Sequence, residues 1–302
     1  MSIPNGLKLR HIEGFLAVAQ DGTISGAARK LNMTQPALSK TIGELELRLG
    51  SVLFDRVGRK TVLTAAGETF QRHALSAMNS IEAGVRSLGG EDRRHTVSVG
   101  ILPTVAGEFF PSVALEFSRQ RPEAQIRVLT GPNKYLLERL RAGEIDLMVG
   151  RMPTAADLAG LKFEFLYEDP IWLVARAGHP MAQADPADAV RKSPLILPNK
   201  GAIIREGVDA YLNVIGLDDV QPAFESVTLS FARALLLNSD MMWFISRGVV
   251  RQEVRSGSLM TFPVKSAFMS GALGMTTKPT AEANGMVAHL AELLRKFGAC
   301  ED

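Results

Sequence analysis

Apolar residues recur at helical spacing twice within the first 31 residues, and a turn signal follows each stripe. The first stripe, at positions 12, 15, 16 and 19, ends at the turn dipeptide Asp21-Gly22. Thr23 suits the amino-terminal cap of a second, shorter helix, in which alanines at positions 27 and 28 permit close approach of a neighbour. Asn32 and Met33 then break the pattern, so two short helices are predicted.

A third helix is predicted to begin at Thr34, whose hydroxyl can cap it. Pro36 falls in the first turn, where the missing N–H of proline is harmless, and Gly50 ends the helix. Its apolar stripe consists of Leu38, Ile42, Leu45 and Leu49. Two short helices joined by a tight turn, the second amphipathic with polar residues at its amino end, form a helix-turn-helix.

A β-hairpin wing is predicted next, because short strands at residues 52–54 and 61–63 flank the basic, glycine-containing segment 56–60. From Ala66 to about Leu88 no proline interrupts the chain, and an apolar stripe predicts one long helix. The stripe consists of Phe70, Ala74, Ala77, Met78, Ile81 and Val85. Such a stripe needs a covering partner, so we expect this helix to pair with its copy in a second chain.

Strands and helices alternate after a charged, glycine-containing stretch at residues 89–95, which is typical of a domain linker. Strands are predicted at residues 96–102, 125–130, 145–149, 167–175, 195–197, 223–227 and 241–245. Helices are predicted at residues 107–120, 136–142, 202–215, 229–238 and 283–297. This alternation predicts an α/β unit whose sheet is largely parallel.

Composition places the chain among ordinary globular proteins, since 46% of its 302 residues are hydrophobic and 22% are charged. Residues 1–90 hold 11 Lys and Arg against 7 Asp and Glu, whereas the rest of the chain has a net charge of −2. Positive charge therefore gathers beside the predicted helix-turn-helix, where a polyanion would bind. The single Cys300, and the lack of a secretory signal or a long apolar run, lead us to expect a cytoplasmic protein that does not enter a membrane.

Sequence motifs of common enzyme classes are missing. The chain contains no HExxH, no GxSxG, no Walker loop and no dinucleotide-binding glycine fingerprint, and its five histidines have no metal-ligand spacing. We therefore expect no catalytic residues, no metal and no cofactor.

The sequence resembles the LysR-type transcriptional regulators along its whole length. The strongest part of the resemblance is Phe15, Gly22, Ala27-Ala28, Leu31, Thr34-Gln35-Pro36-Ala37-Leu38-Ser39, Leu45-Glu46, Leu49-Gly50, Leu53-Phe54-Asp55-Arg56 and Leu63-Thr64-Ala65-Ala66-Gly67. Landmarks of the family's sensor are Gly143-Glu144-Ile145-Asp146-Leu147, His179-Pro180-Met181 and Gly274-Met275-Thr276-Thr277.

The resemblance implies a winged helix-turn-helix DNA-binding domain at residues 1–65, a linker and dimerisation helix at residues 66–90, and an effector-binding domain at residues 91–302. The last would comprise two Rossmann-like αβ subdomains of the periplasmic-binding-protein type. Subdomain I would contain residues 91–168 and 269–302, and subdomain II residues 169–268. A homotetramer built as a dimer of dimers is implied, with promoter DNA, a small-molecule effector and RNA polymerase as partners.

The residues expected to bind DNA lie at the amino end of the third helix and are Thr34, Gln35, Pro36, Ser39 and Lys40. Gln35, Ser39 and Lys40 suit contacts with base edges in the major groove. Thr34 and Gln35 lie in the first turn, where free backbone N–H groups also favour a phosphate. The wing residues Arg56, Arg59 and Lys60 would contact the DNA backbone or minor groove and supply salt-dependent affinity. In the alternative interpretation, Thr34 only caps the helix, Lys40 is a solvated charge and Arg56 braces the wing through an ion pair.

Effector sites in open αβ sheets lie beyond the carboxyl ends of strands, where helix amino termini offer N–H groups to an anion. The residues that the resemblance places near the cleft between the subdomains are Thr104, Thr130, Asn199 and Ser246. Arg151, just past the third strand of the α/β unit, could pair with a carboxylate effector. Alternatively, the hydroxyls are helix caps and Arg151 is a surface arginine. Thr104 is the preferred single candidate.

Four segments of the chain resemble the branch of the family that controls catabolism of protocatechuate and related aromatic acids, or of sugars. They are Arg10-His11-Ile12 in the predicted DNA-binding domain, and Phe231-Ala232-Arg233-Ala234, Trp243-Phe244-Ile245-Ser246 and Gly248-Val249-Val250 in the predicted sensor. We therefore expect a carboxylate from aromatic catabolism as the effector, with a sugar or another metabolite as the alternative. A free-standing solute-binding protein would share the sensor fold, but should carry a secretory signal rather than a DNA-binding motif.

Overall fold

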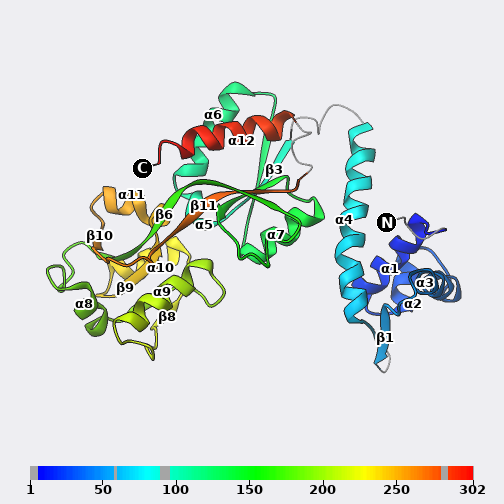
Figure 1. Ribbon diagram of the computed structural model, residues 1–302, viewed down its shortest axis with the longest axis horizontal. Helices are drawn as coiled ribbons and strands as arrows, with labels where there is room; N and C mark the ends of the chain where they lie inside the picture. Colours follow the sequence, from blue (N-terminus) through cyan, green and yellow to red (C-terminus); the bar gives the residue numbers. More distant parts are fainter. Residues whose placement is uncertain (1–5, 58–59, 89–95, 280–284, 302) are drawn as a thin grey trace. The chain divides into compact units, whose positions relative to one another are not determined.

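The computed structural model describes residues 6–57, 60–88, 96–279 and 285–301. The chain divides into two compact units, residues 1–91 and 92–302 (Figure 1). The buried residues of the first unit form a core separate from those of the second. Among the described residues, no helix is long and apolar enough to cross a membrane.

The first unit contains the three short helices, the hairpin and the long helix that the apolar pattern predicts. Its elements are α1 (Leu9–Asp21), α2 (Ile24–Lys30), α3 (Gln35–Leu49), β1 (Phe54–Val57), β2 (Lys60–Leu63) and α4 (Ala65–Leu88). The predicted inward-facing residues form the core, with Phe15 and Leu38 completely buried. Phe15 also contacts Phe70 of α4 edge to face, at 5.0 Å between ring centroids.

The predicted caps set the ends of these helices. The Thr23 hydroxyl accepts the backbone N–H of Gly26 at 3.1 Å, and the Thr34 hydroxyl accepts that of Ala37 at 3.4 Å. Gly50 ends α3 with φ +62°, a left-handed conformation that glycine adopts without a steric penalty.

The first strand of the wing begins two residues later than predicted, at Phe54 rather than at Val52. The carboxylate of Glu46 on α3 accepts the backbone N–H groups of Leu53 and Phe54, at 2.7 and 3.2 Å. These bonds tie the chain to α3 before the hairpin starts, and Val52 is left 61% exposed. The β-propensity of residues 52–54 gave no information about this side-chain anchor.

The second unit is α/β, as predicted. Its elements are β3 (Thr96–Ile101), α5 (Pro103–Ala106), α6 (Phe109–Gln120), β4 (Gln125–Thr130), α7 (Asn133–Ala142), β5 (Leu147–Arg151), β6 (Lys162–Arg176), α8 (Pro186–Lys192), β7 (Leu195–Leu197), α9 (Ile203–Val214), β8 (Phe224–Glu225), α10 (Leu229–Leu237), β9 (Met242–Ser246), α11 (Arg247–Arg255), β10 (Leu259–Phe262), β11 (Ser270–Thr277) and α12 (Gly285–Gly298). The sequence pattern missed α5, α8, α11, β10 and β11.

The sheet is mixed rather than largely parallel, which corrects the prediction. Strands β3, β4 and β5 are parallel, and so are β7, β8 and β9. Strands β6, β10 and β11 run antiparallel to their neighbours. The fifteen-residue β6 joins the two parallel sets, because its first part pairs with β11 up to Pro170 and its second part pairs with β9 from Ile171.

Two separate cores lie on either side of this junction in β6. We call the part around β3, β4 and β5 the first half of the unit, and the part around β7, β8 and β9 the second half. In the first half, α6 and α12 cover one face of the sheet and α7 covers the other (Figure 1). In the second half, Trp243 and Phe244 of β9 are completely buried, so they are core residues. The domain boundaries derived from the sequence stay predictions.

Candidate DNA-reading and effector sites

The amino end of α3 presents polar side chains to solvent. Leu38, Ile42 and Leu45 are buried in the core of the first unit, which turns the opposite face of α3 outward. The predicted DNA-reading residues lie together on that outward end, where Ser39 is half-buried and the others are exposed: Thr34, Gln35, Pro36 and Lys40. Thr34 does cap α3, but its hydroxyl stays exposed and keeps its own proton to donate.

A polar contact between α1 and α3, which sequence reasoning missed, fixes the orientation of α3. His11 is completely buried, its Nδ1 accepts the backbone N–H of Lys8, and its Nε2 lies 3.3 Å from Glu44 Oε2. This hydrogen bond lowers the pKa of the Glu44 carboxyl, while partial burial acts in the opposite direction. An isolated histidine in an apolar stripe gives no sign in the sequence that it has a partner 33 residues away.

The wing is only partly described. The backbone of Arg56 pairs with Thr61 in the hairpin, and Lys60 is exposed at the start of β2. Arg59 lies outside the described residues. The role proposed for these three charges therefore stays a prediction.

The five predicted effector residues all lie at or just beyond the carboxyl ends of strands. Thr130, Arg151 and Ser246 are the last residues of β4, β5 and β9. Thr104 follows β3 within α5, and Asn199 follows β7. Parallel strands bring such ends to one edge of a sheet, which is where small molecules bind in this class of fold.

Three of the five meet in one buried network, and two do not. The Ser246 hydroxyl accepts a hydrogen bond from Arg151 Nε at 3.1 Å and a longer one from the Thr104 hydroxyl at 3.5 Å. All three side chains are buried. Thr130 and Asn199 are exposed and stand apart from this network, and the Asn199 amide donates instead to the backbone oxygen of Glu225.

The capping alternative is not what the structure shows for Thr104. Leu102 occupies the cap position of α5, and the hydrogen bond described for the Thr104 side chain goes to Ser246. Ser246 does precede α11, but no side-chain cap bond is found there.

Arg151 is buried rather than on the surface, and a carboxylate already pairs with it. Its Nη2 lies 2.7 Å from Asp169 Oδ2 and also donates to the Asp169 backbone oxygen at 2.7 Å. Burial raises the pKa of the Asp169 carboxyl, and the neighbouring Arg151 charge acts in the opposite direction. Because a guanidinium stays protonated, we treat the pair as ionic. Sequence reasoning missed Asp169, since burial of a lone acidic residue depends on tertiary packing.

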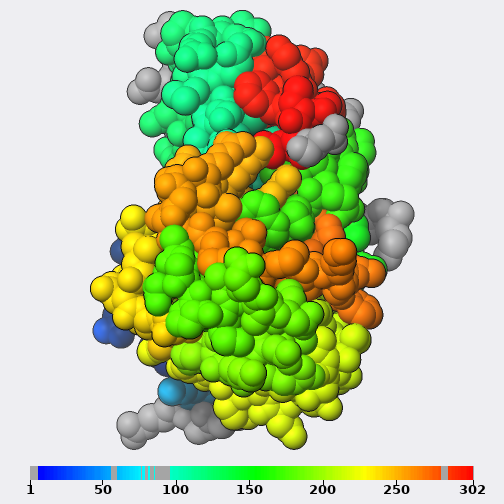
Figure 2. Space-filling model, turned by 90° about the vertical axis from the view of Figure 1, so that its left-hand side faces the viewer, coloured from blue at the N-terminus to red at the C-terminus, as the bar shows by residue number. Residues whose placement is uncertain are grey.

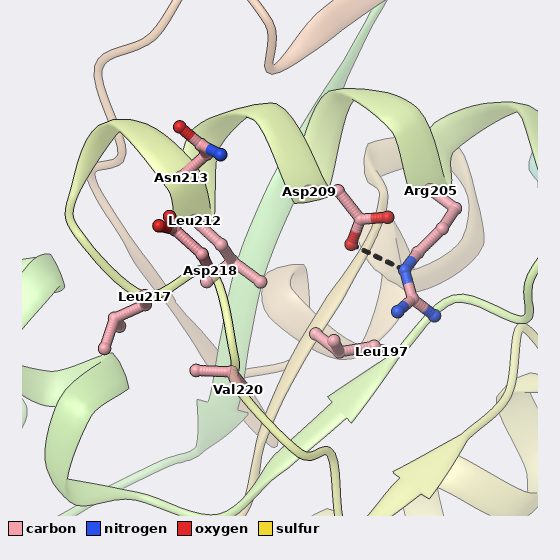
Figure 3. Close-up of a pocket in the computed structure, with 8 residues that line it drawn as sticks. All are labelled: Leu197, Arg205, Asp209, Leu212, Asn213, Leu217, Asp218 and Val220. Carbon is pink, nitrogen blue, oxygen red and sulfur yellow. Dashed lines mark hydrogen bonds and ion pairs between the residues drawn. The ribbon is translucent and has the colours of Figure 1, made fainter.

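A surface pocket with a volume of about 250 Å³ lies elsewhere in the second unit, beside α9 (Figure 3). It contains none of the predicted effector residues. Its one arginine, Arg205, is already bound by Asp209 and Glu225, each at 2.7 Å, and by the backbone oxygen of Pro198. We therefore interpret Arg205 as a brace between α9 and the ends of β7 and β8. No group of three acidic, histidine or cysteine side chains suited to a metal occurs among the described residues.

Comparisons with known proteins match both units. Residues 9–68 match the family model described as bacterial regulatory helix-turn-helix protein, lysR family, and residues 90–299 match the LysR substrate binding domain. The HTH-type transcriptional regulator PcaQ of Agrobacterium fabrum is 35% identical over 294 residues, which cover 96% of this chain and 94% of that protein. The uncharacterized HTH-type transcriptional regulator YdcI of Escherichia coli is 34% identical over 96% of this chain and 95% of its own length.

Solved structures share the fold. A full-length OxyR from Pseudomonas aeruginosa aligns with a TM-score of 0.63 at 20% identity, covering 95% of this chain and 97% of that one. Full-length CbnR in complex with its target DNA aligns with a TM-score of 0.62 at 20% identity, covering 96% of this chain and all of that one. At this identity the likeness concerns the fold alone.

Proposed function

Because this chain belongs to the LysR family of bacterial helix-turn-helix transcription regulators, we propose that a carboxylate from aromatic catabolism controls its activity at a promoter. The family assignment makes the chain a DNA-binding regulator with an effector-binding domain, rather than an enzyme. What the family does not give is the effector, the DNA sequence and the residues that contact each of them.

For DNA, we propose that Gln35 and Ser39 contact base edges, while Thr34 and Lys40 hold the phosphate backbone. The supporting observation is the exposed amino end of α3, whose opposite face is anchored in the core. A helix presented in this way can enter a major groove with its first turns against the bases.

For the effector, we propose that one carboxylate oxygen accepts hydrogen bonds from the Thr104 and Ser246 hydroxyls. The observation that carries this is the buried pair of hydroxyls, 3.5 Å apart, at strand ends from the two halves of the unit. A hydrogen bond of that length is weak, so a better acceptor could replace it. Because Asp169 already neutralises Arg151, we place Arg151 behind Ser246, where it orients the hydroxyl. Thr130 and Asn199 stay candidates for the outer part of the site.

The test is calorimetric titration of the full-length protein with protocatechuate, benzoate and galactose. We expect one of the two aromatic carboxylates to bind and to raise the melting temperature, since a ligand at 100 times its dissociation constant stabilises by about 2.7 kcal/mol. Binding of galactose alone would favour the sugar alternative and contradict the proposed carboxylate. Binding of none of the three would also contradict an effector of this size and chemistry at these hydroxyls.

A further inference from the structure

The start of α11 packs against α5 at a distance that glycine permits. A Cβ atom at Gly248 would lie 2.1 Å from the backbone oxygen of Thr104, and one at Gly107 would lie 2.9 Å from the backbone oxygen of Gly248. Helix α5 belongs to the first half of the second unit and α11 to the second half. The two halves therefore touch backbone to backbone along this contact, which we call the seam (residues 103–108 and 247–255).

A row of alternating charges runs along the seam. Three arginines of α11 are spaced four residues apart and so share one face of the helix, and they meet Glu108 at the start of α6 and Glu301 after α12. In Figure 2, α11 (orange) borders the blue-green surface of α6. The ion pairs are Arg247–Glu301 at 3.5 Å, Arg251–Glu301 at 2.6 Å, Arg251–Glu108 at 3.5 Å and Arg255–Glu108 at 2.5 Å.

Partial burial makes this row stronger than an ordinary surface cluster. The side chains of Arg247 and Glu301 are each 15% exposed, Arg251 is 20% exposed and Glu108 is 27% exposed, whereas Arg255 at the end of the row is 57% exposed. Networks of shielded charges contribute more than isolated exposed pairs, because solvent and salt screen them less. The row also reaches the candidate effector site, since Arg247 Nε lies 4.0 Å from Asp169 Oδ1.

A contact of different character joins the same two halves at the start of α9. There, Ile203 packs against an apolar cluster of the first half that includes Leu102 and Leu137. Salt weakens attraction between charges but does not weaken apolar contacts. The two contacts should therefore respond differently to ionic strength.

We propose that the seam is an electrostatic latch, in which the arginines of α11, Glu108 and Glu301 hold the two halves of the effector-binding domain together along one edge. Release of the latch separates α5 from α11 and exposes the Thr104–Ser246 hydroxyl pair to solvent. The latch exists whatever the effector is. Its regulatory use rests on the proposed function, because the hydroxyl pair that would bind the effector contacts Arg151, whose partner Asp169 lies 4.0 Å from Arg247 of the latch.

Hydrogen exchange of the full-length protein without ligand tests the latch. We compare the wild type with Glu108→Gln/Glu301→Gln, which removes both carboxylate charges and keeps the side-chain size. The reporters are the amides of Val105, which donates to Leu102, and of Gly248, which donates to Asp169. We expect both amides to exchange about tenfold faster in the variant and by the same factor, because one opening exposes both sides of the seam.

Two controls keep this result specific. Glu164→Gln breaks the 2.5 Å pair with Arg295, which lies within the first half, and should leave both amides unchanged. Arg251→Gln removes the middle of the row, and combining it with the double variant should add little further acceleration. Raising NaCl from 0.05 to 1 M should bring wild-type exchange toward that of the variant.

Three outcomes would overturn the proposal. The first is unchanged exchange in the double variant, and the second is equal acceleration in Glu164→Gln. The third is acceleration at Gly248 alone, which would mean that α11 frays without the halves separating. None of these outcomes depends on whether an aromatic carboxylate binds.

Discussion

Gln35 combines exposure with a position in the first turn of α3, and these two properties make it the best single test of base contact. Replacing it with alanine should weaken binding to a specific site by about 1–3 kcal/mol and leave binding to random DNA nearly unchanged. Fluorescence anisotropy on both duplexes measures this. Gln20→Ala makes the same chemical change at an exposed position of α1 and should alter neither. Equal losses on both duplexes for Gln35→Ala would assign the residue to phosphate contact or folding.

Thr104 tests the effector site in the same way. Thr104→Val keeps the shape of the side chain and removes the hydroxyl that reaches Ser246 at 3.5 Å. We expect a loss of about 1–3 kcal/mol in affinity for the bound aromatic carboxylate, with basal DNA binding intact. Calorimetric titration of the full chain checks it, with Thr261→Val in β10 as the matched control. Unchanged affinity together with a lower melting temperature would mean that Thr104 serves packing alone.

For individual residues, the sequence predicted the role of a side chain better than the residue with which that side chain interacts. Thr34 and Thr23 were predictable as caps, because a cap depends on a few neighbouring residues. The pairing of Arg151 with Asp169 was not, because it joins residues 18 positions apart whose burial depends on the folding of β5 and β6 together. The same holds for His11 and Glu44.

Helices α1 and α3 are held by the His11–Glu44 contact, and its strength should depend on pH. The folded-state pKa of Glu44 is lowered, so its stabilising contribution is present above the ordinary value of 4.5 and is lost as the pH falls through the lower folded-state value. Glu44→Gln should therefore lower the melting temperature at pH 7 and have a progressively smaller effect as the pH falls below the ordinary carboxyl value of 4.5. Melting curves from pH 7 to 3.5 measure this.

The exposed Glu13 of α1 supplies the control for that series. Glu13→Gln should leave the pH dependence of melting as in the wild type. A loss for Glu44→Gln that is equal at pH 7 and pH 3.5 would contradict a contact based on the charge of Glu44.

Replacing two helical glycines with alanine should change the free energy of unfolding in opposite directions. At Gly248 of α11 the added methyl group would meet the Thr104 backbone oxygen at 2.1 Å, so Gly248→Ala forces the seam apart and should destabilise by about 1–3 kcal/mol. Gly43 of α3 has open space, so Gly43→Ala should stabilise by about 0.5–1 kcal/mol through helix propensity. Thermal unfolding of both variants measures these two changes in stability. Stabilisation by Gly248→Ala would show that the seam is not tightly packed.

Elements whose apolar residues recur with a clear helical period were predictable from the sequence. Elements whose formation depends on neighbouring strands of the sheet were not. The stripes of α3 and α4 set their lengths, but α11 carries few apolar residues, and Gly248 in its first turn looked like part of a loop. Strand β11 contains two glycines that interrupt the alternation, and it lies between β5 and β6. Its antiparallel position follows from the passage of β6 through both halves, which no local pattern indicates.

At the scale of the whole molecule, the stripe of α4 divides into a covered and an uncovered part. Phe70 and Ala74 pack into the core of their own chain, whereas Ile81 and Val85 are 44% and 64% exposed. We therefore expect the later turns of α4 to pair with a second copy, as the first step toward a dimer of dimers. Val85→Asp should shift the assembly toward monomers.

Sedimentation at micromolar concentration checks this prediction. The exposed Leu115 of α6 supplies the control, since Leu115→Asp adds the same charge at an exposed apolar position of the second unit. A wild type that sediments as a monomer would contradict pairing through α4. Dissociation by Leu115→Asp, but not by Val85→Asp, would move the interface to the second unit.

Membership of this family of regulators implies that the chain recognises a particular DNA sequence. The most direct measurement selects bound duplexes from a random library with the full-length protein, and then compares its affinity for the selected sequence and for a scrambled one at 0.15 M salt. We predict a pseudo-palindromic sequence bound at least about a thousandfold more tightly than the scrambled one. Equal affinity for the two duplexes, or no enrichment of any sequence, would contradict the claim.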